Sequence, residues 1–195
     1  MTFGNKGKSN EVTLDFSSYA GNSVVVAFKY TSSEEVQSTF EIISFSLNEK
    51  VTQDPNAKGT ENNPYTCADL LAMTDLTKNS TGKGFVTGYI VGWVSNSVSA
   101  TNCKFSIDES TLQSNIMIAD DENETDYKKI IPVQLATSPA NCKAVRDLLN
   151  LKDNPNNLNH PVKIQGIIKK YMGANGIGNA NYVEMGGSSA GAKSN

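Results

Sequence analysis

Apolar and polar residues alternate along the first part of the chain with the period of two that is typical of β-strands. The alternation covers residues 11–16, 23–30 and 39–47, and it slips by one position at Ile43, which indicates a bulge. Three strands cannot bury both faces of a sheet by themselves. The sequence therefore predicts a partial antiparallel β-sandwich over residues 1–50, which needs a partner to cover it.

Two segments lack any such alternation. Residues 51–64 are rich in Asp, Asn, Pro and Gly, which predicts a linker. Residues 186–195 consist of Gly, Ser, Ala, Lys and Asn without an apolar anchor, which predicts a flexible tail. A second domain is therefore expected over residues 65–185.

The second domain is predicted to contain five strands. Their expected ranges are 84–94, 115–119, 129–135, 161–169 and 182–185. Gly88 and Gly92 lie inside the first strand, where an interior glycine usually marks a bulge or a sharp coil. A strand that bends around a small barrel needs such points.

Two helices are expected between these strands. Residues 66–69 resemble a capping box, with Asp69 in place of the usual Glu, and start a short helix. The principal helix is expected to begin with Ser138 as N-cap and Pro139 at the first helical position. It is expected to end before the turn-forming residues 154–157. The predicted buried stripe of this helix is Cys142, Val145, Leu148 and Leu149.

The order of three strands, one helix and two strands is the topology of the OB-fold. The predicted fold class is thus mainly β. It comprises a five-stranded OB-type barrel with one helix between strands three and four, together with the partial antiparallel β-sandwich at the N-terminus.

Composition and charge narrow the function classes. Hydrophobic residues make up 38% of the chain and charged residues 19%, which indicates a folded chain rather than a disordered one. No apolar run is long enough for a transmembrane segment, and residues 1–20 lack a stretch of the signal-peptide type. The net charge is −3 and Arg146 is the only arginine, so the chain lacks the basic footprint that nucleic-acid binding requires.

The three cysteines are Cys67, Cys103 and Cys142. An odd number without C-x-x-C spacing argues against a zinc site or a disulfide framework. We expect buried thiols that pack as small hydrophobic side chains. A single bridge between Cys103 and Cys142 is the alternative.

Candidate binding surfaces follow from the predicted barrel. OB barrels usually bind ligands on the face of strands two and three and in the loops after strands one and four. These loops are expected at residues 95–114 and 170–181. The second loop is rich in Gly and Asn, and it is either a flexible hairpin loop or the rim of a ligand site.

Phe85, Tyr89 and Trp93 share one side of the first predicted strand. Aromatic side chains on a barrel can stack on bases or sugars, but they also serve as core residues. Trp93 and Tyr171 lie near predicted loop ends, which favours them as ligand contacts. The candidate ligand-binding residues are Trp93, Tyr89, Tyr127, Lys169, Tyr171 and Asn175.

The sequence offers little catalytic or metal chemistry. His160 is the single histidine, and no Ser-His-Asp set can be completed around it. Residues 120–126 are acidic and could either hold Ca²⁺ or form a solvated loop. The EF-hand pattern, however, requires Gly where Thr125 stands. We therefore predict a protein that is not an enzyme, with no metal site and no cofactor.

Two segments resemble known protein families. The segment from Leu14 to Gly21, followed by Val24–Tyr30 and Phe40–Ile42, resembles the last strands of a jelly-roll domain found in secreted bacterial adhesins. That domain has further strands upstream, so the resemblance implies that the chain is part of a longer protein.

Most of residues 59–185 resemble an OB-fold domain of unknown function from secreted proteins of gut Bacteroidetes. The matching stretches are GTENNPYT (59–66), GYIVG (88–92), NIMIAD (115–120), PVQL (132–135), LNLKDNPNNL (149–158) and residues 166–171. The resemblance implies an exported protein, located at the cell surface, in the periplasm or outside the cell. It implies no activity.

These observations favour a non-catalytic binding or adhesion module of an exported bacterial surface protein, facing polysaccharide or another surface protein. Two alternatives stay open. One is an OB-fold binder of single-stranded nucleic acid, which the charge disfavours. The other is a structural spacer without a ligand. The exposed edges of an incomplete sandwich also predict self-association through the N-terminal strands.

Overall fold

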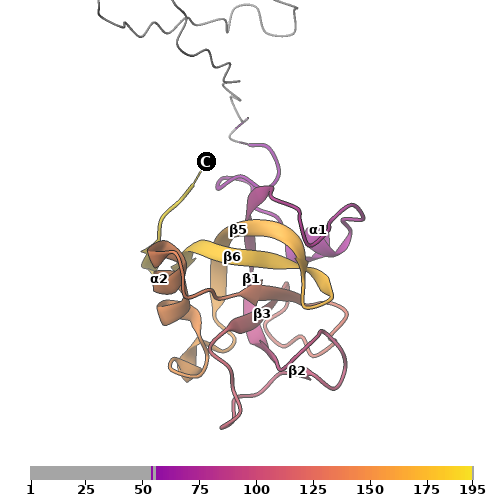
Figure 1. The fold of residues 1–195 in the computed structure, drawn as a ribbon, viewed down its shortest axis with the longest axis vertical. Helices are drawn as coiled ribbons and strands as arrows, with labels where there is room; N and C mark the ends of the chain where they lie inside the picture. Colours follow the sequence, from indigo (N-terminus) through magenta and orange to yellow (C-terminus); the bar gives the residue numbers. More distant parts are fainter. Residues whose placement is uncertain (1–53, 55, 195) are drawn as a thin grey trace, which may run out of the picture. The chain divides into compact units, whose positions relative to one another are not determined.

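The structure is a computed structural model that describes Asp54 and residues 56–194. The predicted sandwich over residues 1–50 and its self-association lie outside the described residues. The elements are α1 (Cys67–Leu71), β1 (Lys83–Val94), β2 (Cys103–Lys104), β3 (Asn115–Ala119), β4 (Ile131–Gln134), α2 (Ala140–Leu149), a 3₁₀-helix η2 (Pro155–Asn157), β5 (Pro161–Tyr171), β6 (Ala174–Met185) and β7 (Ser188–Gly191). Figure 1 shows their arrangement.

The described part is mainly β, as predicted, and its seven strands form one sheet. The strand order is β2-β1-β3-β4-β6-β5, with β7 paired to β6. An additional pairing of β1 with β5 returns the path β1-β3-β4-β6-β5 to its start. All pairings are antiparallel except that of β4 with β6. Helix α2 stands between β4 and β5 in the chain and contacts β6 and β7.

The main core lies on the inner side of these strands. β-Branched residues recur at alternate positions, so each strand turns one face inward. The central side chains include Ile90 on β1, Ile116 and Ile118 on β3, and Ile164 on β5, all fully buried. Leu70, Val145 and Leu149 bring the apolar faces of α1 and α2 into the same core. The expected stripe of α2 is confirmed except at Leu148, which is only partly buried.

A β-bulge interrupts β1 at Gly92, as the interior glycine predicts. The register with β3 shifts between Ile90 and Gly92, and Gly92 has a φ of 150°. The shift turns Trp93 inward to the main core, while Val91 and Val94 join a second, outer cluster. The prediction that Trp93 shares one side of the strand with Phe85 and Tyr89 is therefore wrong, because it assumed unbroken alternation.

The hairpin between β5 and β6 differs from the predicted loop over residues 170–181. Strand β5 continues to Tyr171, and β6 begins at Ala174 rather than at residue 182. The turn consists of Met172 and Gly173, both with positive φ, the geometry that matches the twist of tight hairpins. The Gly- and Asn-rich segment thus pairs along its length with β5, as part of the sheet.

The C-terminal residues form a further hairpin in place of a flexible tail. Gly186 and Gly187 make a two-residue turn with positive φ, and β7 then pairs with β6. Beyond β7, the buried amide of Asn181 donates to the carbonyl of Ala192 at 2.7 Å. The side chain of Gln165 donates to the carbonyl of Ser194 at 2.7 Å. These hydrogen bonds fix the segment that composition alone described as free.

Helix α2 begins one residue later than predicted. Pro139 is the N-cap, with extended backbone at φ −66° and ψ −178°, and no side chain caps the helix. Because the chain is still extended at Pro139, the first helical residue is Ala140, and Ser138 lies outside the cap position.

All three cysteines are buried and free, as expected from their number and spacing. The alternative bridge between Cys103 and Cys142 is not formed. Burial raises the pKa of the thiols of Cys67, Cys103 and Cys142 above its usual range. The thiols thus pack as apolar side chains.

The capping box at the start of α1 is present and makes a pH-dependent contribution to stability. The hydroxyl of Thr66 accepts from the N–H of Asp69, whose carboxylate accepts from the N–H of Thr66 at 2.7 Å. Lys58 forms an ion pair with Asp69 at 2.8 Å. The hydrogen bond from Lys58, followed by that from Thr66, lowers the pKa of Asp69 to about 2.

Replacing Asp69 with asparagine should reduce the acid sensitivity of the protein. A carboxyl with a lowered pKa stabilises the folded state above its unfolded pKa, and this contribution is lost as the pH falls through the folded pKa. The wild type should lose more unfolding free energy than Asp69→Asn between about pH 4 and pH 2. Urea denaturation at several pH values measures this, with Glu122→Gln as an exposed control. Equal losses in the wild type and Asp69→Asn would contradict the assignment.

Candidate functional site

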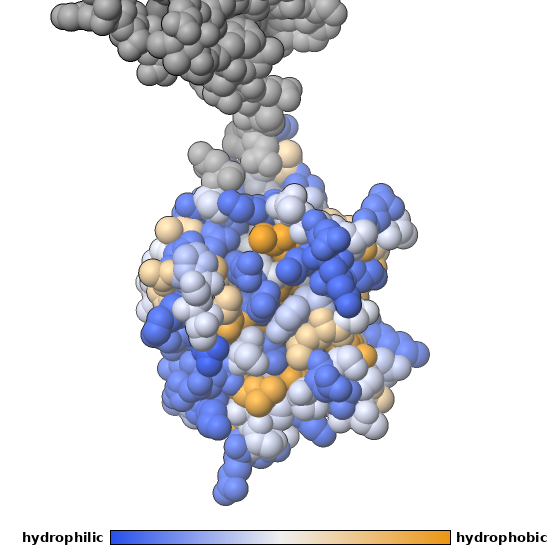
Figure 2. All heavy atoms as spheres, viewed as in Figure 1, coloured by the Kyte–Doolittle hydropathy of each residue, from blue (hydrophilic) through white to orange (hydrophobic). Residues whose placement is uncertain are grey.

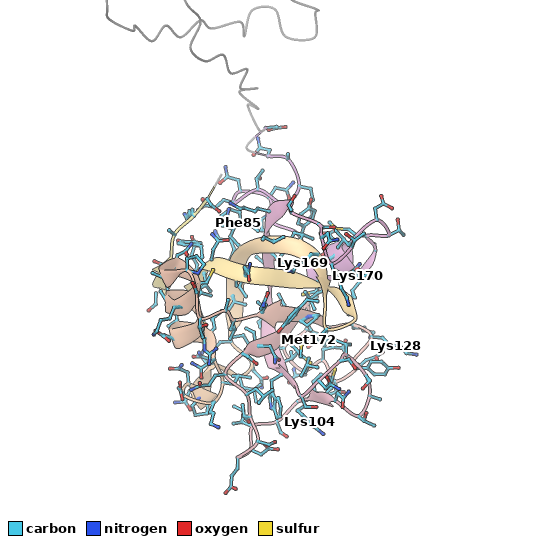
Figure 3. All side chains as sticks on the ribbon, in the orientation of Figure 1. Phe85, Lys104, Lys128, Lys169, Lys170 and Met172 are labelled. Atoms are coloured by element: carbon cyan, nitrogen blue, oxygen red, sulfur yellow. The ribbon has the colours of Figure 1, made fainter. Side chains whose placement is uncertain are left out.

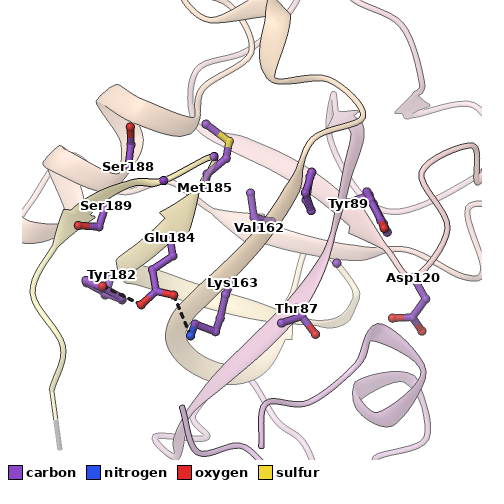
Figure 4. A pocket seen from close by; sticks show the side chains of 14 residues that line it. Thr87, Tyr89, Asp120, Val162, Lys163, Tyr182, Glu184, Met185, Ser188 and Ser189 are labelled. Carbon is purple, nitrogen blue, oxygen red and sulfur yellow. Dashed lines mark hydrogen bonds and ion pairs between the residues drawn. The ribbon is translucent and has the colours of Figure 1, made fainter. Parts of the chain in front are cut away.

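An open groove of about 810 Å³ crosses the outer face of β1, β5 and β6 and reaches the β6–β7 hairpin. Figure 4 shows the side chains that line it. The floor of the groove is formed by β1, β5, β6 and β7, each antiparallel to the next. Residues that are far apart in the sequence therefore lie side by side across these strands.

The central row is polar and crosses four strands. Thr87 pairs with Lys163, Lys163 with Glu184, and Glu184 with Ser189. Directly opposed residues on adjacent strands lie on the same face of a sheet, so their side chains meet. The row presents a hydroxyl, an ammonium, a carboxylate and a second hydroxyl in sequence across the groove.

An ion pair holds the centre of this row. The ammonium of Lys163 lies 2.7 Å from Oε2 of Glu184, and the hydroxyl of Tyr182 donates to Oε1 at 2.9 Å. The hydrogen bond from Lys163, with a further contribution from Tyr182, lowers the pKa of Glu184 below its usual range. Glu184 is therefore ionised at neutral pH and serves as a fixed acceptor.

Two tyrosines stand at the ends of the groove. Tyr182 lies at one end and Tyr89 at the other, with Lys163 and Glu184 between them (Figure 4). Tyr182 is held by an edge-to-face contact with Phe85, at 6.4 Å between ring centroids. The ammonium of Lys193 lies 4.8 Å from the centre of the Tyr182 ring. Both tyrosines are partly exposed, so each leaves ring surface open to the groove.

The other carboxylate of the groove is already engaged with α1. The two oxygens of Asp120 accept the N–H groups of Cys67 and Ala68, each at 2.8 Å. A carboxylate is favourable there, because the first N–H groups of a helix lack partners. Within the described residues no group of three or more His, Cys, Asp or Glu side chains could hold a metal ion.

The structure places only Tyr89 of the six candidate ligand-binding residues in the groove. Trp93 is 2% exposed and donates from Nε1 to the carbonyl of Ser106 at 3.1 Å, so it is a core residue. Asn175 is also buried, and its Nδ2 donates to the carbonyls of Leu70 and Met73 at 2.7 and 2.8 Å. The burial of both side chains argues against them as ligand contacts: the sequence had placed Trp93 near a loop end and Asn175 inside the predicted loop over residues 170–181.

The remaining three candidates lie outside the groove. Tyr127 packs against the outer cluster, as Tyr89 does, and the side chain of Lys169 runs over Gly178. Tyr171 is half-buried, and burial raises the pKa of its phenol. None of the three lines the groove.

The face of β3 and the two expected binding loops are partly filled by the chain itself. Val98 donates from its N–H to the carbonyl of Met172 at 2.9 Å, which joins the loop after β1 to the β5–β6 hairpin. Val98, Phe105 and Met172 pack against the outer cluster, whose buried members include Met117 and Ile130. Figure 2 shows only small hydrophobic patches among hydrophilic residues on the viewed face, and Figure 3 places Met172 near its centre.

Sequence reasoning missed most of the residues that form the groove. Lys163, Tyr182, Glu184 and Ser189 meet only because β6 pairs with β5 on one side and β7 on the other. A signal was present in the Gly-Gly pair after Met185, which is typical of a tight hairpin. Interpreting residues 186–195 as a tail removed β7 and with it the rim of the groove.

Comparison with known proteins identifies the class of domain. Residues 65–186 match the family described as Domain of unknown function (DUF6359). The match covers more than half of the chain, and the protein therefore belongs to the DUF6359 family. The expected resemblance to a domain of unknown function is confirmed at this level. No match was found among curated proteins or among solved structures.

The sequence contains no apolar run long enough for a transmembrane segment, and the helices of the structure agree with this. Within residues 56–194, none of the helices has the length and apolar character needed to cross a bilayer.

Proposed function

We propose that residues 65–185 form an OB-type barrel. The cyclic pairing β1-β3-β4-β6-β5-β1 supports it, with its single parallel contact between β4 and β6. The position of α2 between β4 and β5 supports it as well, since the OB-fold has its helix between the third and fourth barrel strands. In this interpretation β2 and β7 are additions to the five barrel strands.

We also propose that the domain is a non-catalytic glycan-binding module of an exported bacterial surface protein. The observation that carries this proposal is the groove between Tyr89 and Tyr182, with its row of hydroxyl, ammonium and carboxylate groups. Sugars present apolar C–H faces to aromatic rings and hydroxyls to polar groups, and the groove offers both. Its open form suits a polymer that enters and leaves at the ends. Export is supported only by the family resemblance.

The state of the two carboxylates supports binding rather than catalysis. Glycoside hydrolysis requires a carboxylic acid whose pKa is raised, so that it can donate a proton. The pKa of Glu184 is lowered instead. Asp120 uses both oxygens to accept N–H groups of α1. Neither residue is therefore placed to act as a general acid.

Binding of single-stranded nucleic acid is a second candidate, supported by one observation. Lys104, Lys128, Lys169 and Lys170 lie around Met172 in Figure 3, and none of them forms an ion pair with a described residue. These lysines form a local basic face despite the negative net charge. The groove itself contains Glu184 and Asp120, which would repel phosphate.

The glycan proposal is tested by titrating the protein with a panel of neutral and acidic polysaccharides in affinity electrophoresis. Tyr89→Ala should weaken binding at least about fivefold, because stacking on an aromatic ring contributes about 1–3 kcal/mol in comparable sites. Tyr127→Ala, which removes a tyrosine outside the groove, should leave binding unchanged.

Three results would contradict the glycan proposal. The first is the absence of binding to any polysaccharide, which would favour the spacer. The second is a loss of binding in Tyr127→Ala but not in Tyr89→Ala. The third is salt-sensitive binding of single-stranded DNA that Lys169→Gln and Lys170→Gln together remove, in a protein that ignores glycans.

A further inference from the structure

A second, smaller hollow of about 330 Å³ lies near the end of α2, apart from the groove. It is lined by Thr111, Leu112, Gln113 and Ser114 from the segment before β3, and by Arg146 and Lys152. None of these residues lines the groove. Two cationic side chains thus converge on one small hollow that also holds hydroxyl groups.

The guanidinium of Arg146 is held in place without being neutralised. Its Nη2 donates to Oε1 of Gln113 at 2.9 Å, and its Nη1 lies 3.5 Å from the carbonyl of Leu135. Gln113 is fixed in turn, because its Nε2 donates to Asp153 at 2.8 Å. Arg146 forms no ion pair with any residue in the described part of the chain.

Arg146 keeps donors for a ligand. A guanidinium has five N–H groups in a rigid fork, and two of them are used by these contacts. Three N–H groups therefore lack an acceptor among the described residues. A partly buried cation with oriented, unused donors is suited to a planar or tetrahedral oxyanion.

The surroundings add positive charge and hydroxyls. Lys152 is exposed at the rim and forms no ion pair with a described residue. The oxygen of Ser114 accepts weakly from Asn115 at 3.4 Å, which leaves its O–H group able to donate. Two carboxylates that are next to these cations in the chain already have partners: Asp153 accepts from Gln113 in the wall of the hollow, and Asp147 pairs with Lys143.

We infer that this hollow is a binding site for a single oxyanion group, namely a carboxylate, sulfate or phosphate carried by a larger ligand. Arg146 supplies the oriented fork, Lys152 supplies a second charge at the rim, and Ser114 supplies a hydroxyl donor. The inference is independent of the groove and of its proposed glycan. The rival explanation is that Arg146 only stabilises the C-terminal end of α2 by its charge, as cations do near helix C-termini.

The test uses the full chain and the fact that Arg146 is the only arginine. Its Nε–Hε signal in a ¹H–¹⁵N spectrum is therefore unambiguous. The protein is titrated with sodium glucuronate, sodium sulfate and sodium phosphate, and with glucose and sodium chloride at matched ionic strength. We expect a saturable shift with at least one oxyanion and no saturable shift with glucose or chloride.

The arms of this titration distinguish the source of the oxyanion. Saturation with glucuronate alone assigns the site to a carboxylate-bearing sugar, and saturation with sulfate or phosphate alone assigns it to an ester. Lys152→Gln should weaken binding about tenfold, since a hydrogen bond to a charged group contributes about 1.5–3 kcal/mol. Arg146→Lys keeps the charge but loses both the fork and its Nε–Hε signal, so its binding is followed by the backbone amides of Gln113 and Ser114, which also line the hollow. These amides should shift saturably in the wild type and should show no saturable shift in Arg146→Lys.

Shifts that are linear and equal for chloride and for every oxyanion would overturn the inference. Unchanged affinity in Lys152→Gln together with Arg146→Lys would overturn it as well. The rival explanation predicts this pattern, with a loss of thermal stability in Arg146→Gln and no response to any anion. Because Lys152 is exposed, Lys152→Gln should fold. Its anion affinity therefore tests the inference even if a variant of Arg146 does not fold.

Discussion

Replacing Gly92 with alanine is expected to destabilise the protein by about 2–5 kcal/mol. A Cβ atom at this position would lie 2.0 Å from the carbonyl oxygen of Lys104, far inside van der Waals contact. The backbone φ of 150° is in addition a conformation that residues with a side chain rarely adopt. The bulge would have to reform elsewhere, and Trp93 would be displaced from the core.

Urea denaturation followed by Trp93 emission measures this effect, since Trp93 is the only tryptophan and is buried. Gly82→Ala is the matched control, because no atom lies within 4 Å of a Cβ at Gly82. That variant should be neutral or slightly more stable, as a loop residue with less freedom in the unfolded chain. A Gly92→Ala protein with wild-type stability would show that β1 does not need its bulge.

The second large effect is expected at Asn175. Its amide nitrogen donates to the carbonyls of Leu70 and Met73, and so secures the C-terminal end of α1 against β6. Asn175→Ala would leave the carbonyl of Met73 without this partner, while the carbonyl of Leu70 would keep the N–H of Met73 at 3.2 Å. Because an unsatisfied buried acceptor costs about 1–3 kcal/mol, we expect a loss of about 1–3 kcal/mol in urea denaturation.

Asn156→Ala is the matched control for Asn175, because Asn156 is an exposed residue of η2. It should change stability by less than about 0.5 kcal/mol. Polysaccharide affinity of folded Asn175→Ala protein should equal that of the wild type. A selective loss of affinity without a loss of stability would restore Asn175 as a ligand contact.

Strong local patterns were sufficient to predict much of the fold. The largely apolar run Asn115–Ala119 was predicted with its observed bounds, and β1 was predicted to within one residue. Strand β3 is buried at all five positions, and a short apolar run with Ile residues is typical of such a strand. The capping box of α1 and the bulge at Gly92 were also predictable, because each depends on residue types with a specific backbone role.

The missed elements are those whose stability comes from neighbours rather than from propensity. Strand β6 begins with Ala-Asn-Gly-Ile-Gly-Asn, a composition that is typical of loops. Its glycines are needed for close approach, as a Cβ at Gly176 would lie 2.6 Å from the carbonyl oxygen of Pro132. Tertiary packing thus overrides the local preference, and no window of the sequence contains that information.

The candidate site was harder to predict than the fold, for a related reason. A groove depends on register, which decides that Lys163 faces Glu184 and that Glu184 faces Ser189. The bulge in β1 also reversed the side on which Trp93 lies, so the most conspicuous aromatic residue was misassigned. Tyr89 was the one candidate upstream of the bulge, where simple alternation still holds.

The ion pair between Lys193 and Glu61 has a consequence for how the domain would function within a longer polypeptide. The two side chains meet at 2.5 Å, and Figure 1 shows the C-terminal end close to the start of the domain. A polypeptide that continues from both ends would enter and leave at nearly the same point. Such a domain projects sideways from the polypeptide and adds little to its end-to-end length. This geometry is poorly suited to a rod-like spacer and well suited to a domain that presents a binding surface at the side of a longer protein.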